Sequence, residues 1–238
     1  MLFRSRKLGL GILYMHEELT ARTGERTTTF DNDIVILNPK LNYGLWEFLE
    51  FGGGLELNLA NGKESRRLEG GGLDLKSESE IGFSSVVGGV KWNFFDEQGL
   101  RISSSFDTRV ALQPGTFGML GATFFNFELD ADYALSDQLS VVSNMQFITS
   151  DRNEVEDVGI LDLAAAYGFN DRFRGMVFTT IQEDDEAREP AFFFGVAGQM
   201  VHQQHSFTFA VDFQLNDVGR EVEATNQIDL EFSYTITF

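Results

Sequence analysis

The last twelve residues of the chain, Gln227 to Phe238, alternate between apolar and polar side chains without interruption. Successive side chains of a β-strand point to opposite faces, so this stretch predicts a strand with one apolar and one polar face. A soluble sandwich or barrel would turn the polar face to water. A transmembrane barrel would turn the apolar face to lipid and the polar face to a lumen. The apolar face would carry Ile228, Leu230, Phe232, Tyr234, Ile236 and Phe238.

Eleven further segments share this alternation, so the sequence predicts about twelve strands. The clearest runs from Phe125 to Leu135, where aromatic and aliphatic residues alternate with acidic ones. Two are ambiguous: in 173–182, Met176 and Phe178 conflict with Val177 and Ile181, and 191–201 is apolar on both faces. The other segments are 8–17, 34–45, 48–59, 83–95, 100–112, 139–147, 158–169 and 206–216.

The connections between these segments alternate in length. Short polar turns, such as Ser136-Asp137-Gln138, alternate with long charged loops at 18–33, 61–80, 113–121, 150–157, 183–190 and 217–225. Short turns on one rim and long loops on the other are the layout of outer-membrane barrels. An even strand number places both termini on the short-turn rim. Because 18–33 and 61–80 are long for structureless connections, we expect their flanking strands to extend beyond the membrane.

Composition agrees with an all-β chain and excludes several classes of function. There are 24 Phe and 24 Gly but only 3 Pro, a balance that favours strands and tight turns. The chain has no Cys, which excludes disulfides and thiol catalysis. The formal net charge of −19 argues against a nucleic-acid partner, because phosphate binding needs a basic surface. No apolar run approaches the roughly 18 residues of a transmembrane helix.

The N-terminus is interpreted as a short tail followed by the first strand. Arg4, Arg6 and Lys7 precede an apolar run, as in a signal peptide, but that run is short. His16-Glu17-Glu18 follows it where a small-residue cleavage site would stand. We therefore expect a single barrel domain over 1–238, with a tail at 1–7 and the barrel at 8–238. The chain would then be a mature or truncated form without its export signal.

Repeated turns resemble those of a known family. The stretches 43–48, 133–139 and 167–173 each run Tyr, small, apolar, polar turn, apolar, and Gly88-Gly89-Val90-Lys91-Trp92 precedes an acidic turn. Over about residues 8–238 the chain resembles the outer-membrane proteins of the meta-pathway of phenol degradation. The resemblance implies a Gram-negative outer-membrane barrel that takes up hydrophobic or aromatic compounds. It supplies no binding residues that could be carried across.

The C-terminal strand resembles the signal strand that ends bacterial outer-membrane barrels. It finishes on the aromatic residue Phe238, which is also the chain terminus. This resemblance implies recognition by the barrel-assembly machinery. Together with the alternation, it favours an all-β, transmembrane, antiparallel up-and-down barrel.

Charged side chains on the inward faces are the candidate pore-lining residues. Ten acidic positions against five basic ones give a net inward charge of 5 − 10 = −5. An open pore with this lining would be cation-selective, and we expect Glu128, Asp130 and Asp132 to form the strongest unpaired cluster. The alternative is a lumen closed by ion pairs. The fifteen residues are Lys40, Glu50, Glu56, Lys91, Arg101, Asp107, Arg109, Glu128, Asp130, Asp132, Asp162, Arg174, Asp212, Asp229 and Glu231.

No motif in the sequence predicts a catalytic, cofactor or metal site. His202 and His205 lie in a turn without further ligands, and His16 has no assignable serine partner. Carboxylates two residues apart arise in any acidic barrel, so they do not indicate a glycosidase pair. The glycine runs 52–54 and 70–72 lack the lysine and helix of a phosphate loop. The acidic loops 151–157 and 183–189 are interpreted as solvated.

The sequence thus predicts an outer-membrane channel for passive uptake of small solutes. Its expected partners are membrane lipid, lipopolysaccharide, the barrel-assembly machinery and a small-molecule solute, with no nucleic acid. Two alternatives remain: a closed structural or adhesive barrel, and a soluble barrel that binds a ligand inside.

Overall fold

The computed structural model describes residues 5–23, 26–46, 48–67, 73–111, 114–116, 119–120, 122–152, 157–184, 190–215 and 222–238. Strands and turns account for these residues, and none of them forms a helix long and apolar enough to cross a membrane. The backbone groups are therefore paired between strands.

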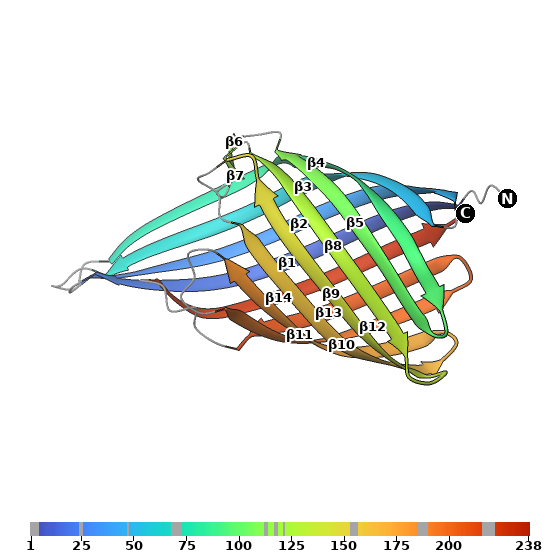
Figure 1. Ribbon diagram of the computed structural model, residues 1–238. Coiled ribbons are helices and arrows are strands. Elements are labelled where there is room, and N and C mark those ends of the chain that lie inside the picture. Colours follow the sequence, from blue (N-terminus) through green and yellow to red (C-terminus); the bar gives the residue numbers. More distant parts are fainter. Residues whose placement is uncertain are drawn as a thin grey trace.

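Twelve strands close into one antiparallel barrel, in the order β1-β14-β13-β12-β11-β10-β9-β8-β5-β4-β3-β2 (Figure 1). This confirms the predicted fold and strand number. The short strands β6 (Pro114–Thr116) and β7 (Met119–Leu120) form a separate pair. The barrel strands are β1 (Ser5–Thr23), β2 (Arg26–Trp46), β3 (Leu49–Arg67), β4 (Leu73–Glu97), β5 (Leu100–Ala111), β8 (Thr123–Ala134), β9 (Leu139–Ser150), β10 (Val158–Asn170), β11 (Phe173–Asp184), β12 (Ala191–His202), β13 (His205–Gln214) and β14 (Val222–Thr237).

The first four strands are the longest of the barrel. β1 to β4 have 19, 21, 19 and 25 residues, whereas β5 and β8 have 12 each. They project together on the side of the barrel opposite to the two termini (Figure 1). Most of the expected loops 18–33 and 61–80 is therefore strand, as their length had indicated. β1 also begins at Ser5, three residues before the expected start.

The outer wall is apolar and the inner wall is mainly polar. Phe127 and Phe209, both expected to point outward, are about half exposed. Their inward neighbours include Glu128 and Thr208. Aromatic pairs lie near the short-turn rim: Trp46 stacks on Phe48 with ring centroids 5.7 Å apart. Such a belt of exposed aromatic residues is typical of a barrel surface at a membrane interface.

The register settles the two ambiguous segments. Phe178 pairs with Gly195, and its ring lies so close to Gly195 that a Cβ there would sit 2.6 Å from the Phe178 Cε2 atom. Gly195 in turn pairs with Asp212, which lies on the inward face of β13. Phe178 and Met176 therefore point into the barrel, and Val177 points out. On β12, Phe193 is buried inside and Phe194 is exposed outside.

The turn between β4 and β5 has the backbone that a two-residue hairpin requires. Gln98 and Gly99, between β4 and β5, have φ angles of 53° and 81°. Positive φ at both central residues is the signature of a type I′ turn, whose twist matches that of the paired strands. A nearby register shift between Asn93 and Phe95 leaves both Phe94 and Phe95 exposed. This bulge adds an aromatic side chain to the outer wall.

Closure of the barrel predicts resistance to detergent. Because every barrel strand is paired on both edges, opening it requires breaking a complete ladder. We expect the detergent-folded protein to migrate faster on a gel when unheated than when boiled. Equal mobility of the two samples, together with solubility in plain buffer, would exclude a membrane barrel.

Adjacent positions on β13 test which face meets lipid. Phe209→Arg should destabilise the folded protein by about 2–4 kcal/mol if the site lies near the bilayer midplane. Thr208→Arg, the same substitution one residue earlier on the inner face, should cost much less. Urea unfolding in lipid vesicles measures both. A larger loss from Thr208→Arg would mean that the faces are inverted and that the barrel is soluble.

Candidate functional site

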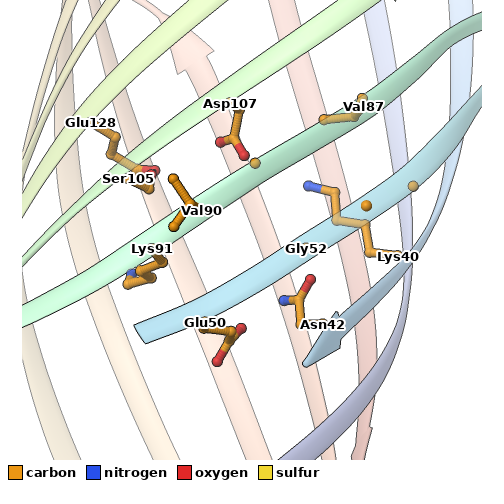
Figure 2. Close-up of a pocket in the computed structure, with 13 residues that line it drawn as sticks. Lys40, Asn42, Glu50, Gly52, Val87, Val90, Lys91, Ser105, Asp107 and Glu128 are labelled. Carbon is orange, nitrogen blue, oxygen red and sulfur yellow. The ribbon is translucent and has the colours of Figure 1, made fainter. Parts of the chain in front are cut away.

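A polar hollow of about 180 Å³ lies inside the barrel against β2 to β5 and β8. Charged and amide side chains from these strands line it, as Figure 2 shows. The sequence had placed all of its charged members on inward faces, and the hollow brings them together. They are Lys40, Glu50, Lys91, Asp107 and Glu128.

Glycines on the inner wall keep this hollow open. A Cβ at Gly89 would collide with the Asp107 carboxylate and would lie 2.6 Å from the Phe106 carbonyl oxygen. A Cβ at Gly52 would collide with the amide oxygen of Asn42. The Asp107 and Asn42 side chains therefore lie flat across a neighbouring strand instead of projecting towards the barrel axis. The glycine run 52–54, which was predicted to ease barrel curvature, also leaves space in which the Asn42 side chain can lie across β3.

Ion pairs occupy the same side of the barrel. Lys7 Nζ lies 2.8 Å from Glu50 Oε2, and Lys91 Nζ lies 2.7 Å from Asp130 Oδ2. The expectation that Glu128, Asp130 and Asp132 form an unpaired cluster is therefore wrong for Asp130. Its carboxylate also accepts hydrogen bonds from Ser103 and Asn144. The sequence could not show this, because Lys91 reaches Asp130 over the intervening strand β5.

Glu56 is the most buried carboxylate among the described residues, with 4% of its surface exposed. Arg109 Nη2 lies 3.0 Å from Glu56 Oε1, and Asn38 donates a hydrogen bond to the same oxygen at 3.3 Å. The Ser85 hydroxyl donates to Glu56 Oε2. These donors offset the cost of burying the charge.

The opposite side of the barrel carries acidic residues without basic partners. Asp212 on β13 stands directly beside Asp229 on β14, and Glu231 lies two residues further along β14. On β10, Asp162 accepts a hydrogen bond from Thr180. Within the described ranges, no ion pair joins any of these four carboxylates to a lysine or arginine. We call Asp162, Asp212, Asp229 and Glu231 the acidic wall.

Apolar side chains flank the acidic wall inside the barrel. Phe178 and Phe193 lie on the β11–β12 side, in the rows beside Asp212. On the other side, Met15 pairs with Asp229 and Leu13 pairs with Glu231. These inward apolar residues were not predicted from the sequence. The inward Arg174 could have revealed Phe178, because residues two and four positions further along a strand share its face.

The remaining candidate residues lie towards the short-turn rim. Asp132 and Arg174 line a second hollow of about 310 Å³ there, and Arg174 donates a hydrogen bond to Ser140. Arg101 pairs with Asp96 at 3.4 Å, with both side chains well exposed. The inward charged residues are thus distributed along the full height of the wall.

The hydrogen bonds and ion pairs of the inner wall join side chains that lie close together around the barrel. Each joins strands that are neighbours or have one strand between them, as Lys91 of β4 and Asp130 of β8 do across β5. An ion-paired plug would instead join side chains from opposite walls. The arrangement therefore favours a hydrated interior over a closed one.

Histidines take part in two clusters on the outer wall. His16 Nδ1 lies 3.0 Å from Asp33 and 3.8 Å from Asp31, the one set of potential metal ligands among the described residues. Tyr14 donates a hydrogen bond to Asp33, so polar protein groups already engage this carboxylate. His205 Nδ1 lies 2.7 Å from the Tyr234 hydroxyl. His202 stands beside His205 across the turn.

The acidic loops are described only in part. Asp151 accepts a hydrogen bond from the Thr123 amide at 2.8 Å, and this contact lowers the pKa of the Asp151 carboxyl. The Thr123 contact ties the start of the 151–157 loop to β8. Residues 153–156 and 185–189 of the two loops, and the glycine run 70–72, lie outside the described residues.

Solved outer-membrane proteins share this fold. An outer membrane channel from Pseudomonas putida F1 matches with a TM-score of 0.68 and 12% identity over 100% of this chain and 97% of that chain. The Ralstonia pickettii toluene transporter TbuX matches with a TM-score of 0.55 and 11% identity, over 100% and 90%. The KdgM porin, solved with oligogalacturonate, gives 0.52 and 10%, over 96% and 99%.

No protein-family model and no curated protein sequence matches the chain. At these identities the structural similarities show the fold alone, an outer-membrane type of β-barrel. The particular family that the turn motifs suggested is not established by them.

Because Glu56 is buried, its ion pair with Arg109 should contribute more to the free energy of unfolding than the exposed pair of Arg101 with Asp96. Arg109→Gln should lower the free energy of unfolding by about 1–3 kcal/mol, because a buried carboxylate loses its counter-charge. Arg101→Gln removes an exposed pair and should cost no more than about 1 kcal/mol. Urea unfolding followed by the fluorescence of Trp46 and Trp92 compares the two variants. Equal losses would show that Glu56 does not depend on Arg109.

Proposed function

We propose that the protein is an outer-membrane channel for the passive uptake of small solutes. The observation that carries this proposal is the course of the polar contacts, which run along the wall and leave a hollow beside it. Passive permeation needs a continuous hydrated path and no chemistry on the solute. Matching folds occur in proteins described as channels, a transporter and porins.

The outer wall supports placement in a membrane. Leucine, valine and aromatic side chains are exposed on all twelve barrel strands, an arrangement that water would not favour. We propose the outer membrane of a Gram-negative bacterium, with the short-turn rim in the periplasm. Lipopolysaccharide would then surround the long ends of β1 to β4. The C-terminal strand β14, ending beside Phe238, would be the segment that the barrel-assembly machinery recognises.

The lumen suggests which solutes pass. Ion pairs engage Glu50, Glu56 and Asp130 on the β1–β8 side, whereas no ion pair joins the acidic wall to a lysine or arginine in the described ranges. A negatively charged surface inside a low-dielectric wall concentrates cations and repels anions. Phe178 and Phe193 beside Asp212 add an apolar surface. We therefore propose small cations and solutes with apolar or aromatic parts, the latter in keeping with the resemblance to the phenol-degradation family.

Two other functions fit the structure less well than a channel. A closed structural or adhesive barrel would need contacts across the lumen, and the contacts described above follow the wall instead. A soluble ligand-binding barrel would need a polar exterior, which the exposed Phe127 and Phe209 contradict. Enzymatic activity has no support from the geometry of the described side chains.

The charge distribution predicts cation selectivity that depends on the acidic wall. A planar bilayer under a salt gradient should give a cation-favouring reversal potential, and high salt should blunt it by screening. Asp212→Asn combined with Asp229→Asn should weaken the preference. The matched control, Lys91→Gln combined with Asp130→Asn, removes an ion pair and no net charge, so the preference should persist.

Three outcomes would count against this proposal. An anion-favouring reversal potential would contradict the charge assignment. Equal effects of the two double variants would mean that the acidic wall does not set selectivity. Absence of conductance would support the closed-barrel alternative.

A further inference from the structure

Two adjoining apolar grooves lie on the outer wall of β11 to β14 near the short-turn rim. They have volumes of about 670 Å³ and 570 Å³. Both are lined by Phe173, Met200, Phe207 and Phe232, so they form one continuous groove. This groove lies outside the barrel and takes no part in the proposed solute path.

A pair of glycines forms the floor of the groove. Gly175 of β11 pairs with Gly198 of β12, and Gly198 pairs with the outward-facing Phe209 of β13. A Cβ added to Gly198 would meet nothing within 4 Å. At Gly175 an added Cβ would lie 3.0 Å from Cε2 of the Phe169 ring, so the space that side chains leave unfilled is the space over Gly198.

The rim end of the groove is polar and cationic. Arg172, His202, His205 and Tyr234 line it there. The Arg172 carbonyl accepts a hydrogen bond from the Val201 amide at 2.8 Å, which fixes the backbone of this turn. In the part of the chain that the structure describes, no carboxylate forms an ion pair with the Arg172 side chain.

We propose that this groove binds a phospholipid of the leaflet at the short-turn rim. One acyl chain would lie over Gly198, beside the Phe169 ring, and the phosphate would meet Arg172 and His202. The apolar part of the groove complements an acyl chain, and the Arg172 guanidinium at its end complements the phosphate. The chain as a whole carries a net charge of −19, so a cationic end is a local exception that favours an anionic group.

A second copy of the barrel fits the groove less well. A two-fold contact places the same patch on both partners, so it would bring two Arg172 side chains towards each other. Charge complementarity therefore favours the lipid. This inference rests on the membrane placement proposed above, although not on conduction through the lumen.

Native mass spectrometry of the whole protein released from lipid nanodiscs tests the proposal. The discs contain phosphatidylethanolamine and phosphatidylglycerol in equal parts. Wild type should retain one phosphatidylglycerol molecule, and Gly198→Leu should lose it because the new side chain fills the floor. Arg172→Gln should retain phosphatidylglycerol about tenfold more weakly, the effect of losing one charge-assisted hydrogen bond.

Gly88→Leu is the matched control. Gly88 is another outward-facing glycine with nothing within 4 Å of an added Cβ, but it lies on β4, away from the groove. This variant should retain the lipid as wild type does. Retention by Gly198→Leu, or loss from Gly88→Leu as well, would overturn the site.

The outcomes also separate this inference from the function on which it rests. Wild-type protein that enters nanodiscs without retaining lipid would overturn the lipid site alone. Failure of wild type to enter nanodiscs would overturn the membrane placement and the lipid site together. A protein dimer that Gly198→Leu abolishes would assign the groove to a second copy instead.

Discussion

The pairing of the first strand with the last is the constraint on which the rest of the structure depends. β1 and β14 pair from Lys7 with Thr237 to Ala21 with Val222. The ladder ends with Phe238 donating its amide to the Arg6 carbonyl at 2.8 Å. In hydrocarbon an unpaired backbone group costs several kcal/mol, so a sheet can stand there only if it has no edge. Closure in turn forces every strand to have one face to the outside and one to the lumen.

The same closure explains why the inner wall is rich in glycine. Inward side chains on a closed sheet converge, and they would fill the interior if each extended towards the axis. At Gly89 and Gly195 the missing side chain lets Asp107 and Phe178 of neighbouring strands lie flat. The glycines thus trade local strand stability for free space inside the barrel. Their positions follow from the lumen and not from turn geometry.

Alternation predicted the strands well where one face meets lipid and the other meets water. The predicted strand 125–135 nearly coincides with β8 (Thr123–Ala134). Where that contrast disappears, the alternation no longer indicates which side chains point outward. β11 carries apolar side chains on both faces, so its phase could not be read from hydropathy. β4 begins at Leu73, in a Ser- and Glu-rich stretch beyond the apolar band, where no lipid imposes alternation.

The ion pairs between inward side chains could not be predicted from the sequence, for a different reason. Alternation assigns a residue to the inner face but does not say how far around the wall or how high it lies. Lys91 meets Asp130 only because β4, β5 and β8 pair in a particular register. The expected cluster of three carboxylates on β8 is therefore partly neutralised, because Asp130 pairs with Lys91. Further inward carboxylates without an ion pair among the described residues lie on β10, β13 and β14.

The placement of the charged side chains around the lumen affects a solute in a way that the net charge alone does not describe. Lysine and arginine side chains pair with carboxylates around β1 to β8, so their fields largely cancel over short distances. The carboxylates of the acidic wall have no lysine or arginine partner in the described ranges, so they add a field from the other side of the lumen. A solute with a positive end would be turned towards Asp212 and Asp229, with its apolar part against Phe178 or Met15. An uncharged solute would gain only the apolar contacts. The asymmetry of the wall, more than its total charge, should therefore decide how a solute is oriented as it crosses.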